Sequence, residues 1–150
     1  MPSLDQPGVK SLSCGGATEA NSLVSPLQGL RILIVEDNPY IAIALEEMLH
    51  EQGLLIAGVA STIERALLLA TGEALDLALL DVNIGDRKID PVAEALTRRG
   101  TPFIFTTGCG RAGLPEAFVN SPVVEKPFYI EEILQTLRSA LASAHGGRST

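Results

Sequence analysis

The stretch of residues 75–85 is the feature that most constrains the fold. Every residue from Leu77 to Leu80 is apolar, and the run then ends in the carboxylate Asp81 and a turn. A short apolar run without polar alternation is typical of a strand covered on both faces, as in a parallel sheet. Such sheets bind ligands at the carboxyl ends of their strands. We therefore expect Asp81 at the ligand-binding edge of the sheet.

Strand and helix patterns alternate along the whole of residues 30–144. Strands are predicted at residues 31–35, 54–59, 75–80 and 102–106, with a short fifth strand from residue 123. Helices are predicted at residues 39–52, 61–70, 90–99 and from 130, whereas the Gly- and Pro-rich residues 108–119 allow one or two turns at most. This order predicts an α/β, flavodoxin-like (βα)5 fold, with a doubly wound five-stranded parallel sheet of order 2-1-3-4-5 and a short or mobile fourth helix.

Three helix starts carry recognisable signals. Asn38 precedes a proline at the first helical position, and Asp90 is followed by proline in the same way. Ser61 with Glu64 has the spacing of a capping box. These signals predict helix N-termini at the three positions.

The domain boundaries follow from composition. Residues 1–29 are rich in Ser, Gly, Pro and Asn without an apolar period, and are predicted to form a disordered tail, with a second short tail at 145–150 around one domain at 30–144. The net charge of −7 argues against a nucleic-acid surface. No apolar stretch is long enough for a membrane span, no signal peptide is visible, and Cys14 and Cys109 lack disulfide or metal spacing. We expect a cytoplasmic protein.

Polar residues follow four of the predicted strands. Glu36 and Asp37 end the first strand, Asp81 the third, Thr106 and Thr107 the fourth, and Lys126 the fifth. Each alone has an ordinary structural explanation as a turn, cap or solvated residue. Together they bring carboxylates, hydroxyls and an ammonium to one edge, which suits Mg²⁺ and the transfer of a phosphoryl group to a carboxylate nucleophile.

These residues and their order resemble the receiver domain of the response regulators of bacterial two-component signalling. The resemblance rests on residues 32–38 (Ile-Leu-Ile-Val-Glu-Asp-Asn), 79–83 (Leu-Leu-Asp-Val-Asn), 107–108 (Thr-Gly) and 125–128 (Glu-Lys-Pro-Phe), and covers all of the expected domain. Residues 105–108 (Phe-Thr-Thr-Gly) also look like the Phe-x-Thr-Gly signature of single-domain receivers with a short fourth helix.

The resemblance implies a role for each site residue. Asp81 would be the phospho-acceptor, and Lys126 would contact the phosphoryl group. Asp81, Glu36 and Asp37 would hold Mg²⁺ together with the backbone carbonyl of Asn83. The switch hydroxyl would be Thr107, for which the adjacent Thr106 competes. The family commonly has a cis peptide between the lysine and the proline after it.

The function implied is that of a stand-alone receiver. It would accept a phosphoryl group from a sensor histidine kinase or a phosphotransfer protein and signal through an unknown protein partner, or act as a phosphate sink. It would catalyse only its own phosphorylation and dephosphorylation. One alternative is an interaction module that works without phosphorylation. Another is an aspartyl-phosphate phosphohydrolase, which Asn83 disfavours because such enzymes usually carry a second acid there.

Overall fold

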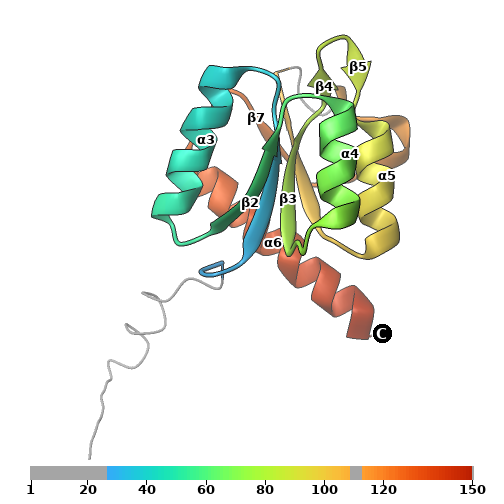
Figure 1. The fold of residues 1–150 in the computed structure, drawn as a ribbon. Coiled ribbons are helices and arrows are strands. Elements are labelled where there is room, and N and C mark those ends of the chain that lie inside the picture. The colour runs from blue at the N-terminus through green and yellow to red at the C-terminus, as the bar shows by residue number, and fades with distance from the viewer. Residues whose placement is uncertain (1–26, 109–112, 150) are drawn as a thin grey trace, which may run out of the picture.

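A computed structural model describes residues 27–108 and 113–149, the last five by their backbone alone (Figure 1). The elements in chain order are β1 (Arg31–Val35), α3 (Pro39–Glu51), β2 (Leu55–Ala60), α4 (Ile63–Gly72), β3 (Leu77–Asp81), β4 (Asn83–Ile84), β5 (Arg87–Lys88), α5 (Asp90–Arg99), β6 (Phe103–Thr107), a 3-10 turn (Glu116–Phe118), β7 (Val123–Glu125) and α6 (Ile130–Ser149). No helix among the described residues is both long and apolar enough to cross a bilayer.

The main sheet has five strands in the order β2-β1-β3-β6-β7, all paired in parallel. This is the predicted order 2-1-3-4-5, so the flavodoxin-like α/β fold is confirmed. All five residues of β3 are buried, as a strand in the middle of a sheet with helices on both faces requires. Where a fourth helix would stand, the described residues form no α-helix, and the 3-10 turn Glu116–Phe118 lies there instead.

The core consists of one apolar cluster on each face of the sheet. Ile32, Ile34, Leu77 and Leu79 pack under α3 and α6 on one face. The residues that alternate with them pack under α4 and α5 on the other, namely Leu33, Val35, Ala78 and Leu80. Figure 1 shows these two helical layers on either side of the sheet. The strands end between these layers at one edge of the sheet, where Asp81 lies.

Both predicted domain boundaries need correction. Leu27 was assigned to the disordered tail, but its side chain is fully buried in the cluster under α3 and α6. The turn that it begins is held by a hydrogen bond of 2.7 Å from Gly29 N to Gly53 O. At the other end, α6 continues to Ser149 through residues that were expected to form a tail. The rest of the predicted N-terminal tail, residues 1–26 with Cys14, lies outside the described residues, as does Cys109.

The predicted helix starts were correct at one position out of three. Asn38 caps α3, and its Oδ1 accepts from Tyr40 N and Ile41 N at 2.9 and 3.3 Å. The cap of α4 is Thr62, whose Oγ1 accepts from Arg65 N, so the capping box at Ser61 was wrong. Asp90 is the first residue of α5 rather than its cap.

A hairpin of β4 and β5 at the carboxyl edge was not predicted. The two short strands pair in antiparallel fashion, Asn83 with Lys88 and Ile84 with Arg87. The tight turn between them requires a positive φ, which Gly85 supplies at 65°. Figure 1 shows the hairpin standing above the sheet beside α4. It places residues 83–88 next to the predicted site.

Candidate functional site

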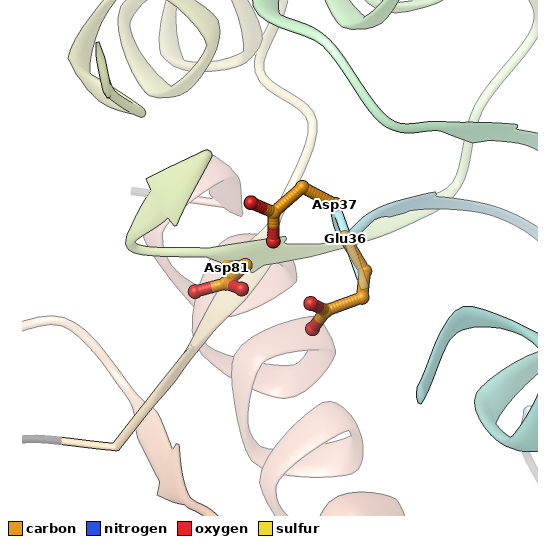
Figure 2. Close-up of side chains that lie close together, drawn as sticks. All are labelled: Glu36, Asp37 and Asp81. Atoms are coloured by element: carbon orange, nitrogen blue, oxygen red, sulfur yellow. The ribbon is translucent and has the colours of Figure 1, made fainter. Parts of the chain in front are cut away.

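Three carboxylates meet at the carboxyl edge of the sheet. Glu36 and Asp37 follow β1, and Asp81 is the last residue of the neighbouring strand β3 (Figure 2). One oxygen from each carboxylate lies within 4.8 Å of the other two. Glu36 and Asp81 are 1% and 6% exposed, whereas Asp37 lies at the surface. The structure thus brings the predicted acids together in one cluster with an open side.

Lys126 supplies the positive charge next to two of these acids. Its Nζ donates to Asp81 Oδ2 at 3.1 Å and lies 3.3 Å from Glu36 Oε1. The contact with Glu36 is an ion pair without hydrogen-bond geometry, since that oxygen has no hydrogen-bond partner. Lys126 follows β7, and the peptide between it and Pro127 is cis, as the resemblance implied.

A backbone N–H group orients each carboxylate. Asn38 N donates to Glu36 Oε2 at 3.1 Å, and Asn83 N donates to Asp81 Oδ1 at 3.2 Å. Asp37 Oδ2 accepts from Gly85 N in the hairpin at 2.7 Å. Hydrogen bonds to a charged acceptor fix its position and favour the ionised form. Each acid is therefore positioned by the fold through one oxygen, while the other oxygens of Glu36 and Asp81 face the ammonium of Lys126.

The crowding of charge shifts two pKa values in the cluster. Burial and the nearby charge of Asp81 raise the pKa of Glu36 from 4.5 to about 7, against the opposing effects of Asn38 N–H and Lys126. Burial alone would lower the pKa of Lys126, but Asp81 and Glu36 together outweigh it and raise that pKa. Shifts of this kind occur where a site is built for chemistry at the expense of stability.

We expect Glu36→Gln to stabilise the protein without added metal. Folded Glu36 keeps a proton that the unfolded chain releases above pH 4.5, so its contribution to stability is complete below pH 4.5 and is lost as the pH rises through about 7. The neutral amide should remove that loss, which is about 2 kcal/mol after allowance for relaxation around the buried charge. Denaturant unfolding at pH 5 and pH 8 measures it.

In that experiment the gain in the free energy of unfolding from Glu36→Gln should be larger at pH 8 than at pH 5. Asp76→Gln serves as a matched control, because Asp76 accepts from Arg31 N far from the cluster. A constant difference between wild type and Glu36→Gln at the two pH values would contradict the raised pKa.

The two threonines of β6 lie on opposite faces of the sheet. Side chains alternate along a strand, so Thr106 shares the face of Ile104 under α3 and α6, and Thr107 shares the face of Phe105 under α4 and α5. Both are buried. Thr106 is the Cα partner of Asp81 in the sheet, while Thr107 O accepts from Lys126 N at 2.8 Å. Both predicted candidates for the switch hydroxyl therefore border the site.

Sequence reasoning places residues 82–85 at the site but misses the hairpin and the contacts that it makes. Gly85 holds Asp37, and the exposed side chain of Arg87 is hydrogen-bonded to Glu64 at the start of α4. This contact lowers the pKa of Glu64. The hairpin thus connects the acidic cluster to α4. The pair Gly85-Asp86 is a hairpin signal, but the flanking strands of two residues are too short to show an alternating pattern.

The donor set fits a hard divalent cation. Mg²⁺ takes oxygen ligands, commonly one or two carboxylates, and keeps several waters. Glu36, Asp37 and Asp81 offer three carboxylate oxygens at mutual distances that one ion can span. Asn83 stands two residues after Asp81 at the start of β4, near the same opening. The geometry is suited to Mg²⁺, with one side open to water or a further ligand.

Comparison with known proteins gives matches of two kinds. Residues 32–138 match the family described as the response regulator receiver domain. The transcriptional regulatory protein PdtaR of Mycobacterium tuberculosis is 30% identical over 132 residues, which are 85% of this chain and 62% of PdtaR. The chain therefore spans less than two thirds of the length of that relative.

Solved structures agree in fold. SdrG of Sphingomonas melonis Fr1 is 38% identical with a TM-score of 0.65, over 81% of this chain and 98% of the SdrG chain. The response regulator PhyR of Brucella abortus is 28% identical with a TM-score of 0.70, over 88% of this chain and 56% of that chain.

Proposed function

The chain belongs to the response regulator receiver domain family, and on this basis we propose that Asp81 accepts a phosphoryl group from a histidine kinase or a phosphotransfer protein. The observation that carries the proposal is the position of Asp81 between two further carboxylates and the ammonium of Lys126. The phosphorylated domain then changes its affinity for a protein partner or withdraws phosphoryl groups from another regulator.

In the proposed reaction an oxygen of Asp81 attacks the phosphorus of a phosphohistidine. The new O–P bond forms as the P–N bond breaks, and the bonding electrons leave with the imidazole, which takes a proton. Asn83 N holds one carboxylate oxygen of Asp81 in place during the attack. Lys126 Nζ, now on Asp81 Oδ2, is close enough to turn to the phosphoryl oxygens and offset their charge. Thr107 supplies a hydroxyl donor to one of these oxygens.

Magnesium has a defined place in this proposal. Glu36, Asp37, Asp81 and the backbone carbonyl of Asn83 would hold the ion. When bound, Mg²⁺ offsets the negative charge that accumulates on the phosphoryl oxygens. The proton on Glu36 must leave before its carboxylate binds metal, so phosphorylation should need less Mg²⁺ as the pH rises through about 7.

Mass measurement of the intact protein tests the proposal. After incubation with a small phosphodonor and Mg²⁺, we expect the mass to increase by one phosphoryl group. The increase should disappear when the metal is chelated, and hydroxylamine should remove the group, because an acyl phosphate is cleaved by it. An unchanged mass at saturating phosphodonor and Mg²⁺, in protein whose unfolding shows that it is folded, would overturn phosphorylation as the function.

A further inference from the structure

Thr106 carries a buried hydroxyl that forms no hydrogen bond in the resting structure. Its side chain is 0% exposed, and Oγ1 has no hydrogen-bond partner. It is the one buried hydroxyl in this condition among residues 27–108 and 113–144, whose side chains are described. A buried polar group left unpaired is costly, and valine would fill nearly the same volume without that cost.

The position of Thr106 in the sheet places this hydroxyl within the phosphoryl site. β6 lies between β3 and β7, and the Cα partners of Thr106 are Asp81 on one side and Val124 on the other. Paired residues of parallel strands present their side chains to the same face. Lys126 stands two residues beyond Val124, and its ammonium reaches Asp81 on β3. The lysine side chain therefore passes over β6 at the level of Thr106.

Phosphorylation changes the hydrogen bonds of Asp81. In the resting structure Oδ2 accepts from Lys126 Nζ and Oδ1 accepts from Asn83 N. Once a phosphoryl group is attached, its oxygens are stronger acceptors for the ammonium, and Lys126 is drawn to them. When the new O–P bond is made at Oδ1, Oδ2 remains as the carbonyl oxygen, and it loses its hydrogen-bond donor as Lys126 leaves. Thr106, the cross-strand neighbour of Asp81, carries a hydroxyl without a hydrogen-bond partner.

We propose that the hydroxyl of Thr106 takes the place of Lys126 as a hydrogen-bond donor to Asp81 in the phosphorylated state. This proposal rests on the proposed function. It differs from the role given to Thr107, whose hydroxyl lies on the opposite face of β6 and donates to the phosphoryl group itself. A hydroxyl that is unpaired at rest and paired after phosphorylation favours the phosphorylated state, because only a difference in binding between two states can shift their equilibrium.

Two measurements with opposite expected signs test the role of Thr106. The first is the unfolding midpoint of the resting protein, which should be raised in Thr106→Val because an unpaired hydroxyl is removed. The second is the affinity for beryllium trifluoride with Mg²⁺, a stable mimic of the phosphoryl group. That affinity should fall roughly three- to tenfold in Thr106→Val, the effect of one hydrogen bond. Thr106→Ser should restore it.

Thr101→Val is the matched control. Thr101 is also buried, but it precedes the opposite end of β6, so its variant should bind the mimic like the wild type. Equal affinity of wild type and Thr106→Val for the mimic would overturn the proposal, as would a variant with Ser that fails to restore affinity. If wild type itself neither binds the mimic nor gains phosphoryl mass, it is the proposed function that fails.

Discussion

Replacing Asp81 by asparagine should abolish phosphoryl uptake. The neutral amide is a poor nucleophile towards phosphorus, whereas its oxygen can still accept from Asn83 N, which now donates to Asp81 Oδ1 at 3.2 Å. The fold should therefore survive the change. We expect no gain of phosphoryl mass in Asp81→Asn under conditions that fully label the wild type.

The same variant should change the proton affinity of its neighbour. The charge of Asp81 is among the causes of the raised pKa of Glu36, so that pKa should fall from about 7 towards its ordinary value. Asp86→Asn, at the exposed tip of the hairpin, is the matched control and should be labelled normally. Persistent labelling of Asp81→Asn would mean that another carboxylate, such as Asp37, is the acceptor.

Replacing Lys126 by methionine should have the largest effect on stability. Methionine keeps most of the packing of the side chain but removes the ammonium that lies within 3.3 Å of both Asp81 and Glu36. Breaking a buried ion pair leaves its partner uncompensated, and we expect a loss of about 3 kcal/mol in the free energy of unfolding at pH 8. Denaturant unfolding measures the loss.

The pH dependence of this loss identifies its cause. At pH 5 Glu36 is protonated in the folded protein, since its pKa is about 7, and the cluster carries one charge fewer. The effect of Lys126→Met should then be smaller than at pH 8. Combining it with Glu36→Gln should recover part of the stability at pH 8, as expected for residues in one electrostatic network. Exposed Lys88→Met is the control, and an equally large loss there would refute the interpretation.

The sequence was sufficient to predict the sheet and the convergence of the acids for a simple physical reason. Uninterrupted apolar runs identify β1 and β3 as strands buried on both faces, and parallel pairing then forces Glu36 and Asp81 to the same edge. The position of Lys126 at this edge follows from the same argument applied to β7. The strand order, the short 3-10 turn and the cluster of carboxylates were therefore predictable without knowledge of side-chain packing.

Features that depend on tertiary contacts were not predictable. Leu27 precedes the first strand pattern, and only its packing under α3 assigns it to the core. Ser61 and Thr62 are both good capping residues, and the local backbone, extended at Thr62, decides between them. The raised pKa of Glu36 follows from burial beside Asp81. The unpaired hydroxyl of Thr106 likewise depends on what surrounds it rather than on any motif.

The turn before β1 has a practical consequence for anyone who excises this domain for fusion to another protein. The family match begins at residue 32, and the first strand begins at Arg31. A cut at either position would remove Leu27 from beneath α3 and the bond from Gly29 N to Gly53 O. The resulting loss of stability could be mistaken for an effect of the fusion partner. A cloning boundary upstream of Leu27 keeps this turn intact.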